Sequence, residues 1–243
     1  MRRCLAAILV VGLAMSVPRD AAAQPSIEEA AAYAAFITTP IGALSPIMIA
    51  PGTKGDKSFS SFAGRYAHFA PQGGGDGTNT FGASFYHKAG MNAAFSGTAA
   101  YLTCSGCDGL FMVGADLHST LWNSATTAKS TSATSINFQG GLGYGSESGN
   151  NALSISAGFP VAMSFMQASK SSFGLYVTPG YMWGRVSGGG ASESGAIPFV
   201  GAGASWMAAA GWGLHASYQK GIIEDVSGNT FGVGFSWNMG AAR

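Results

Sequence analysis

The chain has 243 residues, of which 37 are Gly, and only 9% are charged, against about 25% in ordinary soluble domains. This composition excludes a disordered acidic or basic chain, because such chains combine high charge with little apolar material. A formal net charge of +1, without a Lys/Arg cluster, also argues against a nucleic-acid binder.

The first 23 residues have the pattern of a secretory signal peptide. Two arginines precede an apolar run from Leu5 to Met15, and the small residues Ala21–Ala23 offer a cleavage site. The run is too short to span a bilayer, whose core needs about 20 residues. We therefore predict export with cleavage after Ala23; the alternative is an uncleaved N-terminal anchor.

Residues 24–56 differ in character from the rest of the chain. Ser26–Phe36 is the only clearly helix-like segment, because Ser26 can cap the first turn and two glutamates suit the helix dipole there. The apolar segment that follows, Ile37–Pro51, contains three prolines, which argue against both a helix and a central strand. A short helix and a Pro-rich segment are thus predicted before the main domain.

From about residue 57 the hydrophobic period becomes two, which is the signature of β-strands. In Thr230–Asn238 one face carries Phe, Val and Trp, and the other carries Thr, Gly, Ser and Asn. Four further segments alternate as clearly: 136–144, 153–159, 173–183 and 211–219. Weaker candidates are 58–69, 80–87, 91–102, 109–122 and 196–207. We predict one all-β domain, residues 57–243, of about ten antiparallel up-and-down strands.

The polar faces of these strands carry too few charges for a soluble protein. They consist of Gly, Ser, Thr, Asn and Gln, where a solvent-exposed face would carry many Lys and Glu. A transmembrane β-barrel explains the pattern, with the apolar face toward lipid and the small polar face inside. Closure leaves no edge whose unpaired backbone groups would cost several kcal/mol each in hydrocarbon. The alternative is a soluble sandwich with the aromatic residues in its core.

The chain resembles a Gram-negative outer-membrane β-barrel protein over about residues 57–240. The resemblance rests on the predicted signal peptide, the amphipathic strands and the aromatic-rich segment TFGVGFSWNM near the C-terminus. It implies the outer membrane as location, with outer-membrane lipid and the barrel-assembly machinery as partners. Such proteins typically end on an aromatic residue, whereas this chain continues from Trp237 to Arg243. Either the closing strand ends near Trp237 before a short tail, or the assembly signal is atypical.

An even strand count would place both ends of the barrel on the periplasmic side. Tight turns at Lys88–Gly90 and Ala209–Gly211 then fall on that side, and two Gly/Ser-rich loops, Pro71–Asn79 and Ser187–Gly195, fall outside the cell. Asn123–Thr134 and Pro160–Ser172 would become long periplasmic turns, which fits the usual asymmetry less well. An eight-strand barrel is therefore an open alternative.

The predicted interior carries few large side chains. Most inward residues of the clear strands are Gly and Ser, which would leave volume unfilled in a barrel of eight to ten strands. Residues 26–56 could fill that volume as a plug; the alternative is a disordered leader. The polar residues expected inside are Asp116, His118, Gln139 and Gln219.

Cys104 and Cys107 are the two cysteines that would remain after signal cleavage. In an oxidising compartment a disulfide could close this hairpin. A free pair and a metal or redox pair are alternatives, although no predicted helix would lower the thiol pKa and a metal would need further ligands. No cofactor motif or metal-ligand set is apparent elsewhere, since the Gly-rich runs lack a P-loop lysine.

One triplet suggests chemistry. His215-Ala216-Ser217 resembles the H-x-S pair of outer-membrane lipid A deacylases, which implies His215 as base and Ser217 as nucleophile; Glu224 or Asp225 could act as the acid. That family has Asn after the Ser, where this chain has Tyr218. Side chains two apart on one strand face are also about 7 Å apart by backbone rise.

We therefore expect a protein that is not an enzyme. The expected function is a structural barrel or a narrow passive channel or binder for small solutes. The alternatives are a lipid-modifying hydrolase and a surface adhesion or recognition barrel.

Overall fold

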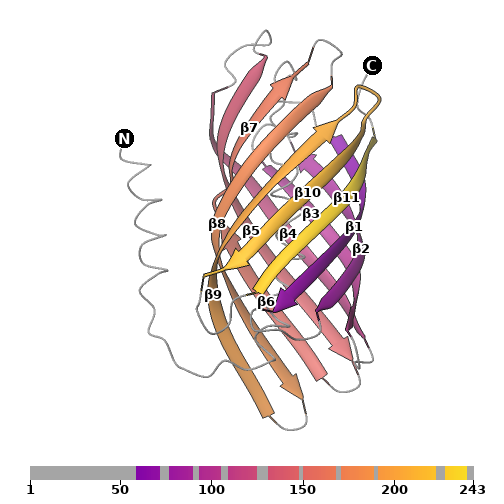
Figure 1. Cartoon of the computed structure of the whole chain (residues 1–243), viewed down its shortest axis with the longest axis vertical. Helices are drawn as coiled ribbons and strands as arrows, with labels where there is room; N and C mark the ends of the chain where they lie inside the picture. Colours follow the sequence, from indigo (N-terminus) through magenta and orange to yellow (C-terminus); the bar gives the residue numbers. More distant parts are fainter. Residues whose placement is uncertain are drawn as a thin grey trace, which may run out of the picture.

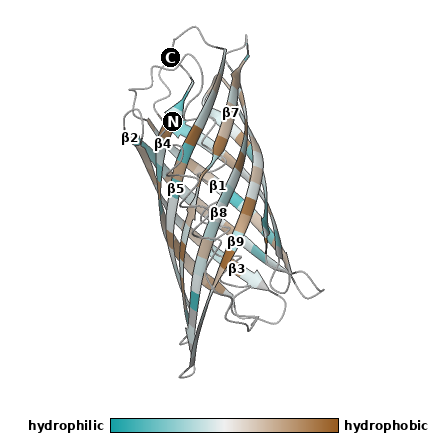
Figure 2. Cartoon of the chain, turned by 90° about the vertical axis from the view of Figure 1, so that its left-hand side faces the viewer, coloured by the Kyte–Doolittle hydropathy of each residue, from teal (hydrophilic) through white to brown (hydrophobic). Residues whose placement is uncertain are grey.

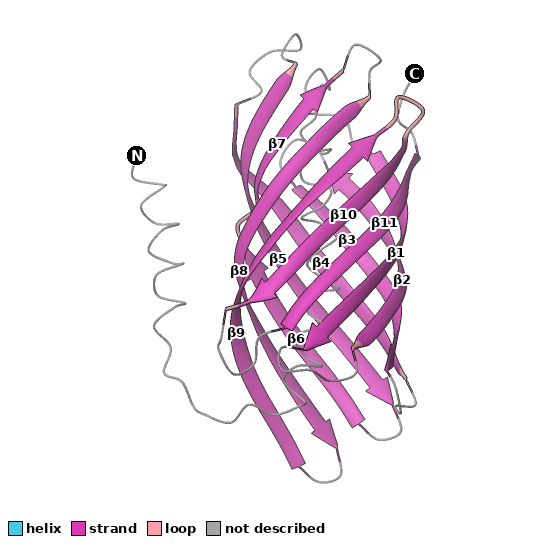
Figure 3. Ribbon diagram, viewed as in Figure 1, coloured by secondary structure: helices cyan, strands magenta, loops and turns pink. Residues whose placement is uncertain are grey.

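The structure of the chain, a computed structural model, describes nine segments: residues 59–71, 77–89, 93–104, 109–124, 131–147, 150–167, 171–188, 191–222 and 228–239. These segments form strands and short connections (Figure 3). None of the described residues belongs to a helix that is long and apolar enough to cross a membrane. The predicted signal peptide, helix and plug lie outside the described residues, as do Cys107 and the side chain of Cys104.

The strands wind around a closed barrel, in which each pairs antiparallel with its neighbours (Figure 1). They are β1 (Phe59–Pro71), β2 (Thr78–Ala89), β3 (Ala93–Cys104), β4 (Leu110–Asn123), β5 (Ser132–Glu147), β6 (Asn150–Gly158), β7 (Val161–Met166), β8 (Ser172–Gly188), β9 (Ala191–Met207), β10 (Trp212–Gly221) and β11 (Gly228–Met239). Pairing of β11 with β1, from Ser60↔Met239 to Pro71↔Gly228, closes the sheet. The fold is thus the predicted all-β antiparallel barrel.

Strands β6 and β7 occupy one position in the wall, so the barrel has ten strands and not eight. Both lie between β5 and β8, and their register runs on without a shift, from Gly158↔Gly180 to Val161↔Val177. The two elements are separated where Pro160 offers no backbone N–H to the ladder. The prediction of a long turn over Pro160–Ser172 is therefore wrong, because the strand resumes directly after the proline.

The prediction of a loop at Ser187–Gly195 is also wrong. Here β8 and β9 form a hairpin in which Ser187 pairs with Ser192 and Gly188 with Ala191. Both strands have 17 residues, more than the 9–11 that a tilted strand needs to cross a bilayer core, and they project below the other strands in Figure 1. Pairing along this projecting hairpin overrides the low strand propensity of Gly and Ser.

The two rims of the barrel are distinct. The terminal rim carries the start of β1, the end of β11 and the turn at 208–211, where Gly211 has φ of 88° and Ala208 N–H donates to the Trp212 carbonyl at 2.8 Å. This confirms the predicted turn at Ala209–Gly211. The hairpin rim, at the other end, carries the β8–β9 connection. Strand β11 reaches Met239, two residues beyond Trp237.

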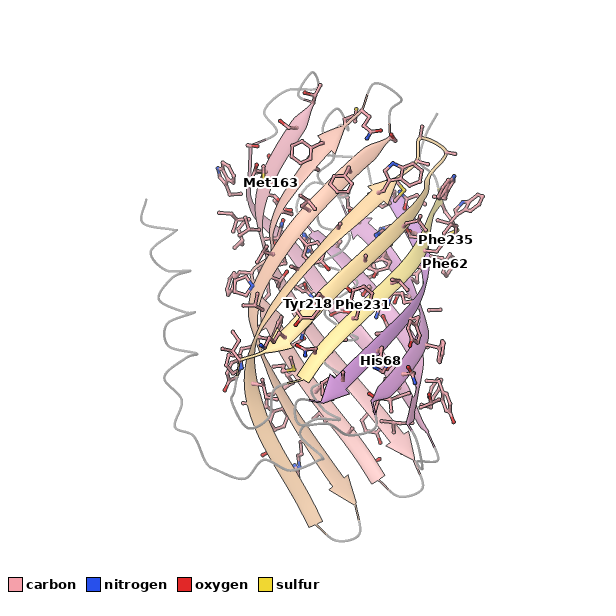
Figure 4. All side chains as sticks on the ribbon, viewed as in Figure 1. Phe62, His68, Met163, Tyr218, Phe231 and Phe235 are labelled. Atoms are coloured by element: carbon pink, nitrogen blue, oxygen red, sulfur yellow. The ribbon has the colours of Figure 1, made fainter. Side chains whose placement is uncertain are left out.

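Side chains alternate between an apolar outer face and a polar inner face. On β11 the outward residues Phe231, Val233 and Trp237 are 54%, 46% and 56% exposed, whereas the inward residues Thr230 and Ser236 are 6% and 0% exposed. Figure 2 shows hydrophobic and hydrophilic residues alternating along the strands, and Figure 4 shows Phe62, Phe231 and Phe235 on the wall. A soluble barrel would have the opposite arrangement, so this outer face suits lipid.

Candidate functional site

The inner face contains a cluster of large polar side chains, which we call the Arg65 cluster: Arg65, Tyr86, Asp116 and Tyr176. Arg65 lies within electrostatic range of the other three, and Tyr86 and Asp116 are each 4% exposed. The four come from β1, β2, β4 and β8. In a ring of ten strands β8 is four positions from β1, so Arg65 and Tyr176 approach from nearly opposite walls. The cluster therefore gathers large polar side chains from distant strands at one level of the interior.

Inward glycines make room for these side chains. A Cβ at Gly203 would lie 2.6 Å from the Ala216 carbonyl oxygen and would collide with the Tyr176 ring. A Cβ at Gly234 would lie 3.3 Å from Cγ of Arg65 and 3.8 Å from Cδ2 of His215. Glycine at these positions thus lets long side chains of neighbouring strands lie flat against the inner wall. The inner faces of the clear strands carry Gly and Ser as predicted, and the large polar side chains of the Arg65 cluster lie among them.

Asp116 also accepts a hydrogen bond from a serine of the neighbouring strand β3. Ser96 Oγ donates to Asp116 Oδ2 at 3.1 Å, and the neighbouring Ser84 and Thr98 hydroxyls are 2.8 Å apart. The other oxygen, Asp116 Oδ1, is buried without a hydrogen-bond partner, whereas the Tyr86 side chain hydrogen-bonds Arg65 and Ser84. Buried polar atoms normally have partners, so Asp116 Oδ1 marks a place where water or a polar solute would be bound.

A second inner group lies nearer the terminal rim. His118, Asn137 and Gln139 are at most 1% exposed, and His118 hydrogen-bonds Asn137. Lys88, 5% exposed, lies within electrostatic range of His118, and its Nζ is 6.0 Å from the centroid of the Phe59 ring. Gln219, the remaining polar residue expected inside, is 6% exposed and lies near the hairpin rim. All four residues expected inside are thus on the inner face.

The structure does not bring His215 and Ser217 together. His215 Nε2 is 2.7 Å from Ser236 Oγ on β11, and Ser217 Oγ donates to the Gly232 carbonyl at 3.5 Å. Both side chains face the interior, and Ser236 is fully buried. Glu224 and Asp225 lie outside the described residues. The described residues also contain no group of three or more His, Cys, Asp or Glu side chains that could hold a metal ion.

The sequence of residues 60–238 matches the family model of the outer membrane protein β-barrel domain. The chain belongs to this family. Its place is therefore the outer membrane, and the apolar face described above contacts lipid. No curated protein matches the sequence.

Solved structures with a similar fold include three bacterial barrels. Ail of Yersinia pestis is 12% identical with a TM-score of 0.35, over 76% of this chain and 99% of that chain. The β domain of the Bordetella autotransporter BrkA is 10% identical with a TM-score of 0.45, over 75% and 99%. The outer membrane enzyme PagL is 11% identical with a TM-score of 0.31, over 74% and 99%. These similarities are too low to carry a function to this outer-membrane barrel.

Sequence reasoning missed the cations inside the barrel. Arg65 lies in a segment whose two faces both carry Ala, Gly and aromatic residues, so its inward face was not assigned. The prediction of a turn at Lys88–Gly90 is wrong for Lys88, which lies in β2 and pairs with Phe59 and Ala94. The positive charge of these residues could have indicated that they face inward. A cation in the middle of a membrane-spanning strand is expected to face inward, because the lipid face penalises Arg and Lys most strongly at the bilayer midplane.

The contact between His215 and Ser236 leads to a prediction about stability. Replacing Ser236 with Ala should lower the free energy of unfolding by about 1 kcal/mol, because it removes a short hydrogen bond inside the wall. Ser61→Ala should have a smaller effect, since the hydrogen bond that Ser61 Oγ donates to the Phe62 carbonyl is 3.5 Å long. Urea unfolding of the two variants in vesicles measures the difference. An equal loss in both would contradict the pairing of His215 with Ser236.

Proposed function

We propose that this outer-membrane barrel is a narrow passive channel for small polar solutes, with its constriction at the Arg65 cluster. The observation that carries the proposal is the gathering of Tyr176 and Asp116, which come from distant strands of the wall, within electrostatic range of Arg65. Large side chains gathered at one level of the interior narrow any path along the barrel axis. Polar groups at this level would then decide which solutes pass.

The charges of the interior suggest which solutes those are. The described inward side chains include two cations, Arg65 and Lys88, and one carboxyl group, Asp116. Arg65 lies at the constriction and Lys88 toward the terminal rim. An excess of positive charge along a narrow path raises the local concentration of anions. The channel is thus expected to favour small anionic or neutral polar solutes over cations.

Arg65→Ala tests this proposal. We expect the native barrel in a planar bilayer to give a small conductance with a preference for anions. The variant should conduct more, because a long side chain is removed from the constriction, and should lose the preference for anions. The matched control is Arg185→Ala, since Arg185 is exposed on the outer face of β8 and should leave both quantities unchanged.

Two outcomes would contradict the proposal. If neither the native barrel nor Arg65→Ala conducts, the barrel is a closed structural element of the membrane. If Arg185→Ala changes selectivity as much as Arg65→Ala does, the selectivity does not arise at the constriction. The hydrolase hypothesis at His215 and Ser217, and the hypothesis of surface adhesion through the connections of the hairpin rim, stay predictions.

A further inference from the structure

Charge is rare on the outer face of the barrel. Among the described outward side chains of the strands, the only Lys, Arg, Asp or Glu residues are Lys220 of β10 and Arg185 of β8. Both are cations, both are exposed, and both lie near the hairpin rim, since β8 ends at Gly188 and β10 at Gly221. Arg185 has a neighbour in its own hairpin, because its Nη2 donates to Ser192 Oγ at 3.4 Å.

Lys220 belongs to a compact group on β10, β11 and β1, which we call the rim patch: Lys220, Tyr218, Asn229, Phe231 and His68. The register places them side by side, because Lys220 pairs with Asn229, and Phe231 pairs with both Tyr218 and His68. Figure 4 shows Tyr218 and Phe231 next to each other on the wall. Neighbouring strands are about 4.8 Å apart, so the patch spans about 10 Å across the wall.

Hydrogen bonds fix the direction of the polar groups in and beside the patch. The Tyr218 hydroxyl donates to Asn229 Oδ1 at 2.6 Å, and the Tyr66 hydroxyl donates to Asn79 Oδ1 at 2.7 Å. His68 Nδ1 lies 3.0 Å from the same Asn79 oxygen and must be the donor, since that oxygen can only accept. Because the side-chain oxygens of Asn229 and Asn79 accept these hydrogen bonds, their side-chain N–H groups are the donors that a ligand could use. An ammonium group and amide donors are thus arranged along one stretch of the rim.

Apolar surface continues from this stretch toward the middle of the membrane. Phe231 is 54% exposed and Val233, the next outward residue on β11, is 46% exposed. A cation with N–H donors at the rim, above an aromatic and aliphatic surface, complements a lipid that has an anionic headgroup above its acyl chains. A lipid with a neutral headgroup would leave Lys220 without a counter-charge.

We propose that the rim patch binds a phosphorylated glycolipid of the outer leaflet, of the lipid A class. A phosphate accepts hydrogen bonds from Lys220 and Asn229, and an acyl chain lies over Phe231 and Val233. The hairpin rim is taken as the outer one, as expected from an even strand count with periplasmic chain ends. The site is separate from the channel, because the rim patch faces outward and the Arg65 cluster faces inward.

Native mass spectrometry of the folded full-length barrel in detergent tests this proposal. The probes are bisphosphorylated lipid A and the same lipid A without its phosphates. The native protein should bind the phosphorylated form more tightly, and Lys220→Gln should weaken that binding about fivefold, the effect of losing one exposed charge contact. Lys220→Arg keeps the charge and should bind as the native protein does. Arg185→Gln, at the same rim but outside the patch, should also bind normally.

Three outcomes would overturn the proposal. The first is equal binding of phosphorylated and phosphate-free lipid A by the native protein. The second is an equal loss of binding in Lys220→Gln and Arg185→Gln, which would indicate general attraction to the rim. The third is a dimer that Lys220→Gln dissociates, which would make the patch a contact between two copies of the chain. A heat-dependent gel shift in every variant confirms that the barrel is folded.

Discussion

Replacing Val233 with Arg should lower the free energy of unfolding of the barrel by about 2–4 kcal/mol. Val233 is outward-facing, 46% exposed, and lies midway between the ends of β11, where the outer face meets the middle of the bilayer. An Arg there must leave its charge in hydrocarbon or distort the lipid to reach water. Denaturant unfolding of the barrel in phospholipid vesicles measures the loss.

The matched control is the same change at the rim. Met239→Arg on the same face of the same strand should change the free energy of unfolding by only about 0–1 kcal/mol, because the side chain reaches the interface. The contrast between the two variants depends on depth in the membrane and not on strand propensity. Equal effects at both positions would mean that β11 does not present this face to lipid.

The second large effect is expected inside the wall. Gly203→Val should destabilise the barrel by about 3 kcal/mol, the upper range for overpacking, since a Cβ would lie 2.6 Å from the Ala216 carbonyl oxygen. The Tyr176 ring occupies the same space, so both backbone and side chain must move. Folding in vesicles, followed by unfolding in urea and by gel mobility without heating, should show the loss.

Gly64→Val is the control for this prediction. Gly64 is also in a strand, but it faces outward and a Cβ there would meet no atom within 4 Å. A β-branched side chain should stabilise this strand position by about 0.5 kcal/mol relative to glycine. If Gly203→Val is tolerated as well as Gly64→Val, the packing of Tyr176 against the inner wall is not as described.

The clear alternation near the C-terminus was enough to predict the fold and the face that meets lipid. In β10 and β11 aromatic residues alternate with small polar ones, and the structure places them outside and inside as predicted. Prolines and glycines made the strand boundaries hard to predict. Pro160 and the Ser187–Gly195 segment have the composition of loops, yet strands continue there because neighbouring strands provide backbone hydrogen-bond partners.

The interior was harder to predict, because its contacts join strands that are far apart in sequence. His215 faces Gly234 directly, so the diagonal neighbour across the strand pair is Ser236, which is closer than Ser217 on the same strand. The Arg65 cluster depends on barrel closure and on the glycines that make room for it. Sequence alone gives neither the register nor the strands that lie opposite each other.

The central claim, that the aromatic face contacts lipid, is tested most directly by the intrinsic fluorescence of the native protein. All five tryptophans, at positions 122, 183, 206, 212 and 237, lie on outward faces. Brominated acyl chains should therefore quench this fluorescence strongly in proteoliposomes, and aqueous iodide should quench it weakly. Strong quenching by iodide, with little effect of brominated lipid, would contradict the membrane-spanning barrel.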